Sequence, residues 1–172
     1  MNIVLIALAV AVGCISAAIA DDQDVTAINI AVIRAEHDKL NRGDWQAATE
    51  EYAQDTRNFG KPVGQAGIRN VLEDIYRTFP DWRMEIVDIA ATGDAVIVRC
   101  KVSGTHRGVG KIPVNGGLLV GVAPTQKHFE VQHIHWYILH GGKIVDHYAT
   151  RDDIGMMQQL GLLPAVARPD TK

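Results

Sequence analysis

The chain has 172 residues, of which 47% are hydrophobic and 22% are charged, and its formal net charge is −3. This length favours a single domain that buries a substantial core. Because the 17 Lys and Arg residues are fewer than the 20 Asp and Glu residues and form no basic run, we expect no nucleic-acid partner.

The N-terminal segment is apolar from residue 3 to residue 20 and then changes abruptly to "DDQD". Its end, Ala18-Ile19-Ala20, matches the small-x-small cleavage pattern of a secretory signal peptide. A retained membrane anchor is the alternative, because the apolar run is close to the length that spans a bilayer. We favour a signal peptide over residues 1–20 and one exported domain, periplasmic or secreted, over residues 21–172. After cleavage we expect no stable membrane association.

Three helices are expected in the first half of the mature chain. Residues 24–41 suit a helix whose apolar stripe holds Val25, Ile28, Val32 and Ala35. Gly43 should end it, and Asp44 should cap a short second helix. The third helix should begin at Gly64 and end before Pro80. Its apolar residues recur every three or four positions: Ile68, Val71, Leu72, Ile75 and Phe79.

Beyond residue 80 the apolar pattern changes to the alternation of strands. "RMEIVDIAATGDAVIVRCKVSG" predicts two strands joined by a turn at Gly93-Asp94. Residues 104–125 carry six glycines and two prolines, which indicates a long loop or flap of the kind that often serves function. Strands follow over 126–139 and 143–150, then a short helix capped by Asp152. Helices followed by an antiparallel sheet predict an α+β domain.

The last two strands, "VQHIHWYILHGGKIVDHY" over residues 131–148, carry an unusual number of ionisable groups for an apolar hairpin. A two-residue turn at Gly141-Gly142 would set the register outward from the turn. One face would then hold His133, His135, Tyr137, Asp146 and Tyr148. The other face would hold Ile134, Trp136, Ile138, Val145 and Ala149, with Gln132 and His147 toward its edges.

Three interpretations of the polar face compete. It could be a solvent-facing surface, or a metal site in which Asp146 joins the His133-x-His135 pair. It could also be the floor of a pocket in which a carboxylate and imidazoles do acid–base chemistry. We favour the pocket, because an exposed strand face normally carries Lys, Glu and Thr. We expect no metal and no organic cofactor, since the chain also lacks a glycine-rich phosphate motif that opens a helix after a strand.

Four further residues are candidates for substrate binding alongside Tyr137 and Tyr148. His106 lies where strand becomes flap and could close over a ligand, although an exposed loop histidine fits as well. Arg99 could bind an oxyanion or pair across the strands with a residue such as Glu85. Asn58 should face the pocket mouth, and Trp45 should belong to the core or the pocket lining.

Four segments in this order, "NRGDW", "FPDWRMEIVDIAATGDAVIVRCKVSGTH", "GGKIVDHYATRDD" and "MMQQLG", resemble the SnoaL-like polyketide cyclases, also called ester cyclases. This family is part of the nuclear transport factor 2-like superfamily, and the resemblance covers roughly residues 25–163. It implies a cone-shaped α+β fold in which a curved antiparallel sheet wraps over the N-terminal helices around one apolar pocket. It also implies a homodimer, since open sheets of this kind commonly pair their outer faces.

The resemblance further implies a reaction. In such cyclases an aspartate on the last strands acts as acid and base, a histidine on the preceding strand assists, and the metal-free reaction is an aldol closure. Asp146 matches the aspartate, and His133 or His135 matches the histidine. The implied ligand is small, apolar and carbonyl-containing. Because the superfamily also holds isomerases, hydrolases and binding proteins, the alternatives are such an enzyme or a non-catalytic exported domain that binds a small molecule.

Overall fold

A computed structural model describes residues 25–113 and 118–164 of the chain. The predicted signal peptide lies outside these residues, and so does its cleavage site. Within the described ranges, no helix has the length and apolar character needed to cross a membrane.

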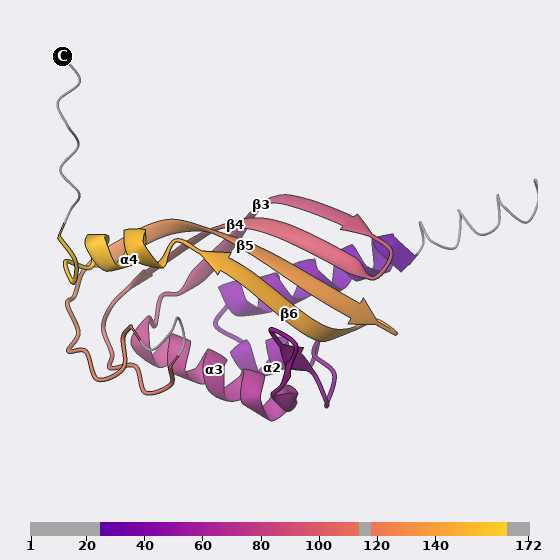
Figure 1. Cartoon of the computed structure of the whole chain (residues 1–172), viewed down its shortest axis with the longest axis horizontal. Helices are drawn as coiled ribbons and strands as arrows, with labels where there is room; N and C mark the ends of the chain where they lie inside the picture. The colour runs from indigo at the N-terminus through magenta and orange to yellow at the C-terminus, as the bar shows by residue number, and fades with distance from the viewer. Residues whose placement is uncertain (1–24, 114–117, 165–172) are drawn as a thin grey trace, which may run out of the picture.

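Four helices are present in the described residues (Figure 1). The N-terminal helix covers residues 25–41, and α2 (Trp45–Thr49), α3 (Gly64–Thr78) and α4 (Asp153–Gln159) follow. Gly43 ends the first helix with φ of 76°, a left-handed conformation that glycine adopts without strain. Asp44 then caps α2, as predicted, by accepting a hydrogen bond from the amide of Ala47 at 3.2 Å.

The buried side of the N-terminal helix differs from the prediction. Val25 and Ile28, expected in the core, are 36% and 56% exposed. The helix instead buries a stripe of mixed polarity: Asn29, Ile33, Glu36, His37 and Leu40. The predicted stripe followed apolar residues alone. The observed stripe is set by polar partners on the sheet, so that the helix turns two ionisable side chains toward the interior.

The main sheet consists of four antiparallel strands in the order β3-β4-β5-β6. These are β3 (Arg83–Thr92), β4 (Ala95–Thr105), β5 (His128–His140) and β6 (Lys143–Arg151). A small separate hairpin is formed by β1 (Arg57–Asn58) and β2 (Lys61–Pro62). The sheet curves over the N-terminal helix and α3, so that its concave face lines the interior (Figure 1). This arrangement is the predicted α+β fold.

The predicted register of the last hairpin is correct only next to its turn. His140 pairs with Lys143 and Leu139 with Ile144, but Ile138 then pairs with Asp146, which leaves Val145 as an extra residue. Such a β-bulge inverts which side chains of the following residues face inward. His147, Ala149 and Arg151 therefore share the inner face with His133 and His135, whereas Asp146 and Tyr148 lie on the outer face.

The described residues between β4 and β5 contribute to the cavity lining, as expected of the predicted flap. A buried carboxylate on α3 anchors it: Asp74 accepts hydrogen bonds from the amides of Lys111 and Ile112, each at 3.0 Å. Near its start, Gly108 lies directly against the backbone of Arg77, where a β-carbon would clash. The described part of the flap is thus fixed to the C-terminal half of α3.

Candidate functional site

A cavity of about 340 Å³ lies between the concave face of the sheet, the two long helices and the flap. Its walls are largely apolar and include Ile68, Leu72 and Ile75 from α3 and Ile112 and Leu119 from the flap. Its polar lining comes from the two last strands, the N-terminal helix, the residue Tyr52 after α2, β1 and α3: Glu36, Tyr52, Asn58, Asp74, Thr78, His133, His135, Tyr137, His147 and Arg151. An apolar chamber with a few converging polar groups is the usual form of a small-molecule site.

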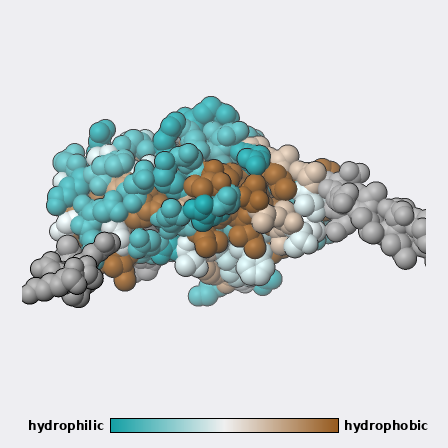
Figure 2. Space-filling model, turned by 90° about the horizontal axis from the view of Figure 1, so that it is seen from above, coloured by the Kyte–Doolittle hydropathy of each residue, from teal (hydrophilic) through white to brown (hydrophobic). Residues whose placement is uncertain are grey.

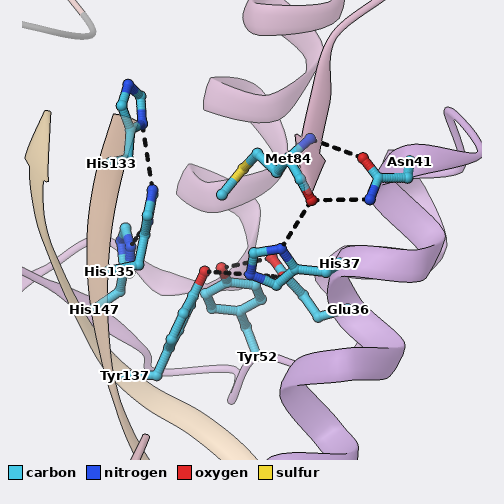
Figure 3. Close-up of polar contacts among 9 residues, drawn as sticks. All are labelled: Glu36, His37, Asn41, Tyr52, Met84, His133, His135, Tyr137 and His147. Carbon is cyan, nitrogen blue, oxygen red and sulfur yellow. Dashed lines mark hydrogen bonds and ion pairs between the residues drawn. The ribbon is translucent and has the colours of Figure 1, made fainter. Parts of the chain in front are cut away.

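Three histidines on the sheet form a hydrogen-bonded row, which we call the imidazole ladder (Figure 3). His147 Nε2 lies 2.8 Å from His135 Nδ1, and His135 Nε2 lies 3.4 Å from His133 Nδ1. At the far end, His147 Nδ1 lies 3.1 Å from the side-chain oxygen of Asn58. Successive inward positions of β5 and the bulged β6 bring these rings together.

The ladder is electrically neutral at neutral pH. Burial lowers the pKa of His147 to about 4, with a further contribution from the Arg151 guanidinium. Burial also lowers the pKa of His133 to about 4, again assisted by Arg151. Burial and the neighbouring imidazoles hold the pKa of His135 well below its usual value. Each ring therefore carries a single N–H.

Asn58 sets the direction of the ladder. An amide oxygen only accepts hydrogen bonds, so Nδ1 of His147 must be the donor to it and Nε2 of His147 the acceptor. His135 then donates through Nδ1 and accepts through Nε2 from the Nδ1 of His133. The Nε2 of His133 is left as a basic nitrogen with no partner assigned by the ladder. The row of hydrogen-bond donors therefore ends at Nε2 of His133, which is a proton acceptor at the cavity.

A second polar cluster lies where the N-terminal helix meets the sheet (Figure 3). Tyr52 donates to Oε1 of Glu36 at 3.1 Å, and the Tyr137 hydroxyl lies 3.3 Å from Nε2 of His37. Burial raises the pKa of Glu36 to about 8 and lowers the pKa of His37 to about 4. Both side chains are neutral at pH 7, and Oε2 of Glu36 is buried without a hydrogen-bond partner.

Four of the predicted site residues lie at the cavity. His133, His135, Tyr137 and Asn58 all line it. His133 and His135 are 3% and 7% exposed, and Tyr137 is 1% exposed, so this part of the polar face is interior rather than solvent-facing.

Asp146 and Tyr148 are not among the cavity-lining residues, in contrast to the prediction. The bulge at Val145 turns both side chains to the outer face, where Tyr148 donates to Asp146 at 3.0 Å. The Asp146 carboxylate also accepts from the amide of Gly60, which holds the β1–β2 hairpin against β6. The inner face of β6 presents His147, which the prediction had placed on the other side.

Three other candidates occupy structural positions outside the cavity lining. His106 is fully buried at the base of the flap, where its Nδ1 accepts from the amide of Thr125 at 3.2 Å. Arg99 lies on the outer face of the sheet and forms an ion pair with Asp88, a cross-strand partner of the predicted kind although not Glu85 itself. Trp45 is half-buried and packs against the core.

Sequence reasoning missed four ionisable residues of the cavity lining: Glu36, Asp74, His147 and Arg151. For Glu36 a signal existed, because it stands at helical spacing between the buried Ile33 and Leu40. For His147 and Arg151, the sequence showed that the side chains of β6 alternate between two faces, but which of them face inward depends on the bulge.

The metal site considered from the sequence does not fit the geometry, since Asp146 lies on the face opposite to His133 and His135. Within the described ranges, no group of three or more His, Cys, Asp and Glu side chains is arranged to hold a metal ion.

Comparison with known proteins agrees with this architecture. A profile of the SnoaL-like polyketide cyclases matches residues 30–160, which is more than half of the chain. No curated protein gives a significant match.

Solved structures share the fold. IdmH of Streptomyces antibioticus, provisionally assigned as a polyketide cyclase, is 28% identical with a TM-score of 0.62, over 77% of this chain and 98% of that one. AclR of Streptomyces galilaeus, provisionally assigned as a hydroxylase, is 23% identical with a TM-score of 0.68, over 83% and 87%. A SnoaL-like polyketide cyclase of Agrobacterium tumefaciens is 20% identical with a TM-score of 0.60, over 77% and 98%.

The profile match and the curved sheet over N-terminal helices point to one assignment, and the chain belongs to the SnoaL-like polyketide cyclase family.

Proposed function

We propose that this protein is an acid–base enzyme that removes a proton next to a carbonyl group of a small apolar molecule, in an aldol-type ring closure or a related reaction. The observation that carries the proposal is the imidazole ladder, which ends in the free Nε2 of His133 at an apolar cavity. The step needs no metal and no organic cofactor. The family and the likeness to IdmH make a polyketide ester the first substrate class to test.

In the proposed step, Nε2 of His133 takes the proton from the carbon beside the carbonyl. The electron pair of that C–H bond moves to the carbonyl oxygen and forms an enolate. The enolate carbon then attacks a second carbonyl of the same molecule, and the imidazolium returns its proton to the resulting alkoxide. Neutral His133 is ready to accept at pH 7, since its pKa is about 4. The row of donors behind it keeps Nε2 as the accepting nitrogen.

The proposal replaces Asp146 as the base, because its carboxylate is held on the outer face by Gly60 and Tyr148. It keeps His135, which orients His133 by accepting its Nδ1–H. A desolvated imidazole is a weaker base than a carboxylate with a raised pKa. The cavity offsets this by holding the reacting carbon close to the nitrogen.

The test is exchange of α-protons for deuterium in D₂O, followed by NMR with apolar ketones such as 2-tetralone and with aromatic ketoesters. We expect the protein to accelerate exchange and His133→Gln to lower that rate by about 10²–10⁴-fold. His140→Gln is the matched control, since His140 lies on the same strand and is exposed. Equal rates for the two variants would contradict the role of His133. Binding without exchange would instead support the non-catalytic binding domain.

A further inference from the structure

Arg151 carries a charge at the cavity without a close acceptor for it. It stands at the end of β6 and lines the cavity. Its Nε is buried and has no hydrogen-bond partner, and its nearest carboxylate oxygen, Oδ1 of Asp153, lies 3.7 Å away. That distance exceeds a hydrogen bond, so the guanidinium is only loosely paired.

Two other arginines of the chain, Arg77 and Arg99, are paired more closely. Arg77 holds Asp74 at 2.6 Å and Glu73 at 2.8 Å, and Arg99 is hydrogen-bonded to Asp88 on the outer face. Among the described residues that line the cavity, Arg151 is the one Arg or Lys. The described part of the cavity lining therefore contains one guanidinium, and its donors remain available to a ligand.

The position of Arg151 relative to the proposed base is defined by the sheet. Arg151 is the direct cross-strand partner of His133, so the two side chains project from neighbouring points of the same face. A basic nitrogen and a cationic donor thus stand side by side at one end of an apolar chamber. Removal of a proton next to a carbonyl requires this pair of groups, one for the proton and one for the oxygen that gains the charge.

We propose that Arg151 is the oxyanion-binding residue of the cavity, donating to the ligand oxygen that becomes negatively charged when His133 takes the proton. This inference rests on the proposed function and extends it to a second catalytic residue. One guanidinium matches one negative charge, so the site suits a single enolate or carboxylate oxygen group rather than a dianion. Its planar N–H donors suit such oxygens better than an ammonium group would.

The first test is catalytic. With 2-tetralone, Arg151→Gln is expected to lower kcat for α-proton exchange by about 10²–10³-fold and to leave KM nearly unchanged, because the charge develops only after binding. Arg151→Lys should recover part of the loss. Arg99→Gln is the control, since it removes the same charge from the outer face. Equal kcat values for Arg151→Gln and Arg99→Gln would overturn the inference, and so would a change confined to KM.

The second test needs no catalysis and uses calorimetric titration with 2-naphthoate and its neutral analogue 2-naphthamide. The protein should bind the carboxylate about 10- to 100-fold more tightly, and Arg151→Gln should lose that preference but still bind the amide. Equal binding of both compounds by the unmodified protein would overturn the inference, even if Arg151→Gln failed to fold. A lost preference with unchanged exchange would show an anchor for a ligand carboxylate and overturn the catalytic role.

The two tests separate this inference from the proposed function. Exchange that depends on His133 but not on Arg151 would remove Arg151 from the mechanism and leave the base in place. Absence of exchange, together with a carboxylate preference that depends on Arg151, would remove the proposed reaction and retain an anion-binding residue.

Discussion

Glu36 is a carboxylic acid that the fold keeps neutral. It is 1% exposed, and burial raises its pKa to about 8, while the hydrogen bond from Tyr52 limits the shift. The unfolded chain would ionise the same group near its ordinary value of 4.5. Between pH 4.5 and about 8, the folded protein holds a proton on Glu36 that the unfolded chain has lost. The free energy of unfolding therefore falls as the pH rises through this range.

The predicted pH dependence is clearest above pH 6.5. His37, His133 and His147 act in the opposite direction, because their lowered pKa values make stability rise with pH only between about 4 and 6.5. Between pH 6.5 and 8 we expect the protein to lose about 1–2 kcal/mol of unfolding free energy through Glu36.

Glu36→Gln should abolish most of this loss, because the amide is neutral at every pH and keeps the shape of the acid. Urea denaturation at a series of pH values measures the effect. Parallel stability curves for the two proteins across this range would show that Glu36 is not the group responsible.

At the level of elements, the flap depends on one buried side chain. Asp74 is 3% exposed, and its carboxylate accepts the amides of Lys111 and Ile112 from the flap as well as a hydrogen bond from Arg77. Hydrogen bonds to a charged acceptor contribute about 1.5–3 kcal/mol each. The flap residues that line the cavity are therefore held in place largely by α3.

Asp74→Asn should loosen this attachment with little change of shape. The amide has one acceptor oxygen in place of two and directs an NH₂ group toward backbone N–H groups. We expect hydrogen exchange of the Lys111 and Ile112 amides to accelerate at least about tenfold. Glu73→Gln is the control, since Glu73 pairs with the same arginine on the exposed side. Equal protection of these amides in both variants would refute the anchor.

For the whole molecule, the outer face of the sheet is the proposed dimer surface. An apolar patch lies on this face among hydrophilic side chains (Figure 2). Ile97, Ile134 and Trp136 point outward from neighbouring strands and are 42%, 49% and 48% exposed. An exposed apolar group of this kind on a sheet indicates an interaction surface, and a second copy of the chain offers the same patch for a two-fold contact.

We expect the protein to sediment as a dimer and Trp136→Glu to sediment as a monomer, because the substitution would bury a charge in the interface. Val109→Glu provides the control, as Val109 is 39% exposed but belongs to the flap. Analytical ultracentrifugation distinguishes the two states. A monomeric unmodified protein, or a dimeric Trp136→Glu variant, would exclude this surface.

Export remains a prediction about residues outside the described ranges. Cleavage after Ala20 would give a mature N-terminus at Asp21. Mass spectrometry of protein recovered from the periplasm or medium should identify that residue. Finding Met1 on soluble protein in the cytoplasm would rule out the signal peptide.

Local sequence patterns were enough to predict the order of the helices and of the four main strands, and most of their ends, but not the small β1–β2 hairpin. Gly43 and Pro80 interrupt helices through their own backbone preferences, and Gly93-Asp94 forms its turn through a left-handed glycine. The helix α3 could be predicted in the same way, because its apolar residues recur every three or four positions and this spacing is local. These features depend on a few adjacent residues, and the family resemblance added the curvature of the sheet around one pocket. His133, His135 and Tyr137 were placed together correctly because all three lie on one unbroken strand.

Which residues complete the site depended on how the strands and the N-terminal helix pack together. One extra residue, Val145, inverts the phase of β6, and a two-residue period carries no information about where such an insertion falls. The N-terminal helix turns Glu36 and His37 inward because His37 meets Met84 and Tyr137, which are 47 and 100 positions away. Contacts between such distant residues do not follow from local spacing. The proton acceptor on His133 and the guanidinium beside it were therefore visible only once the strands were paired.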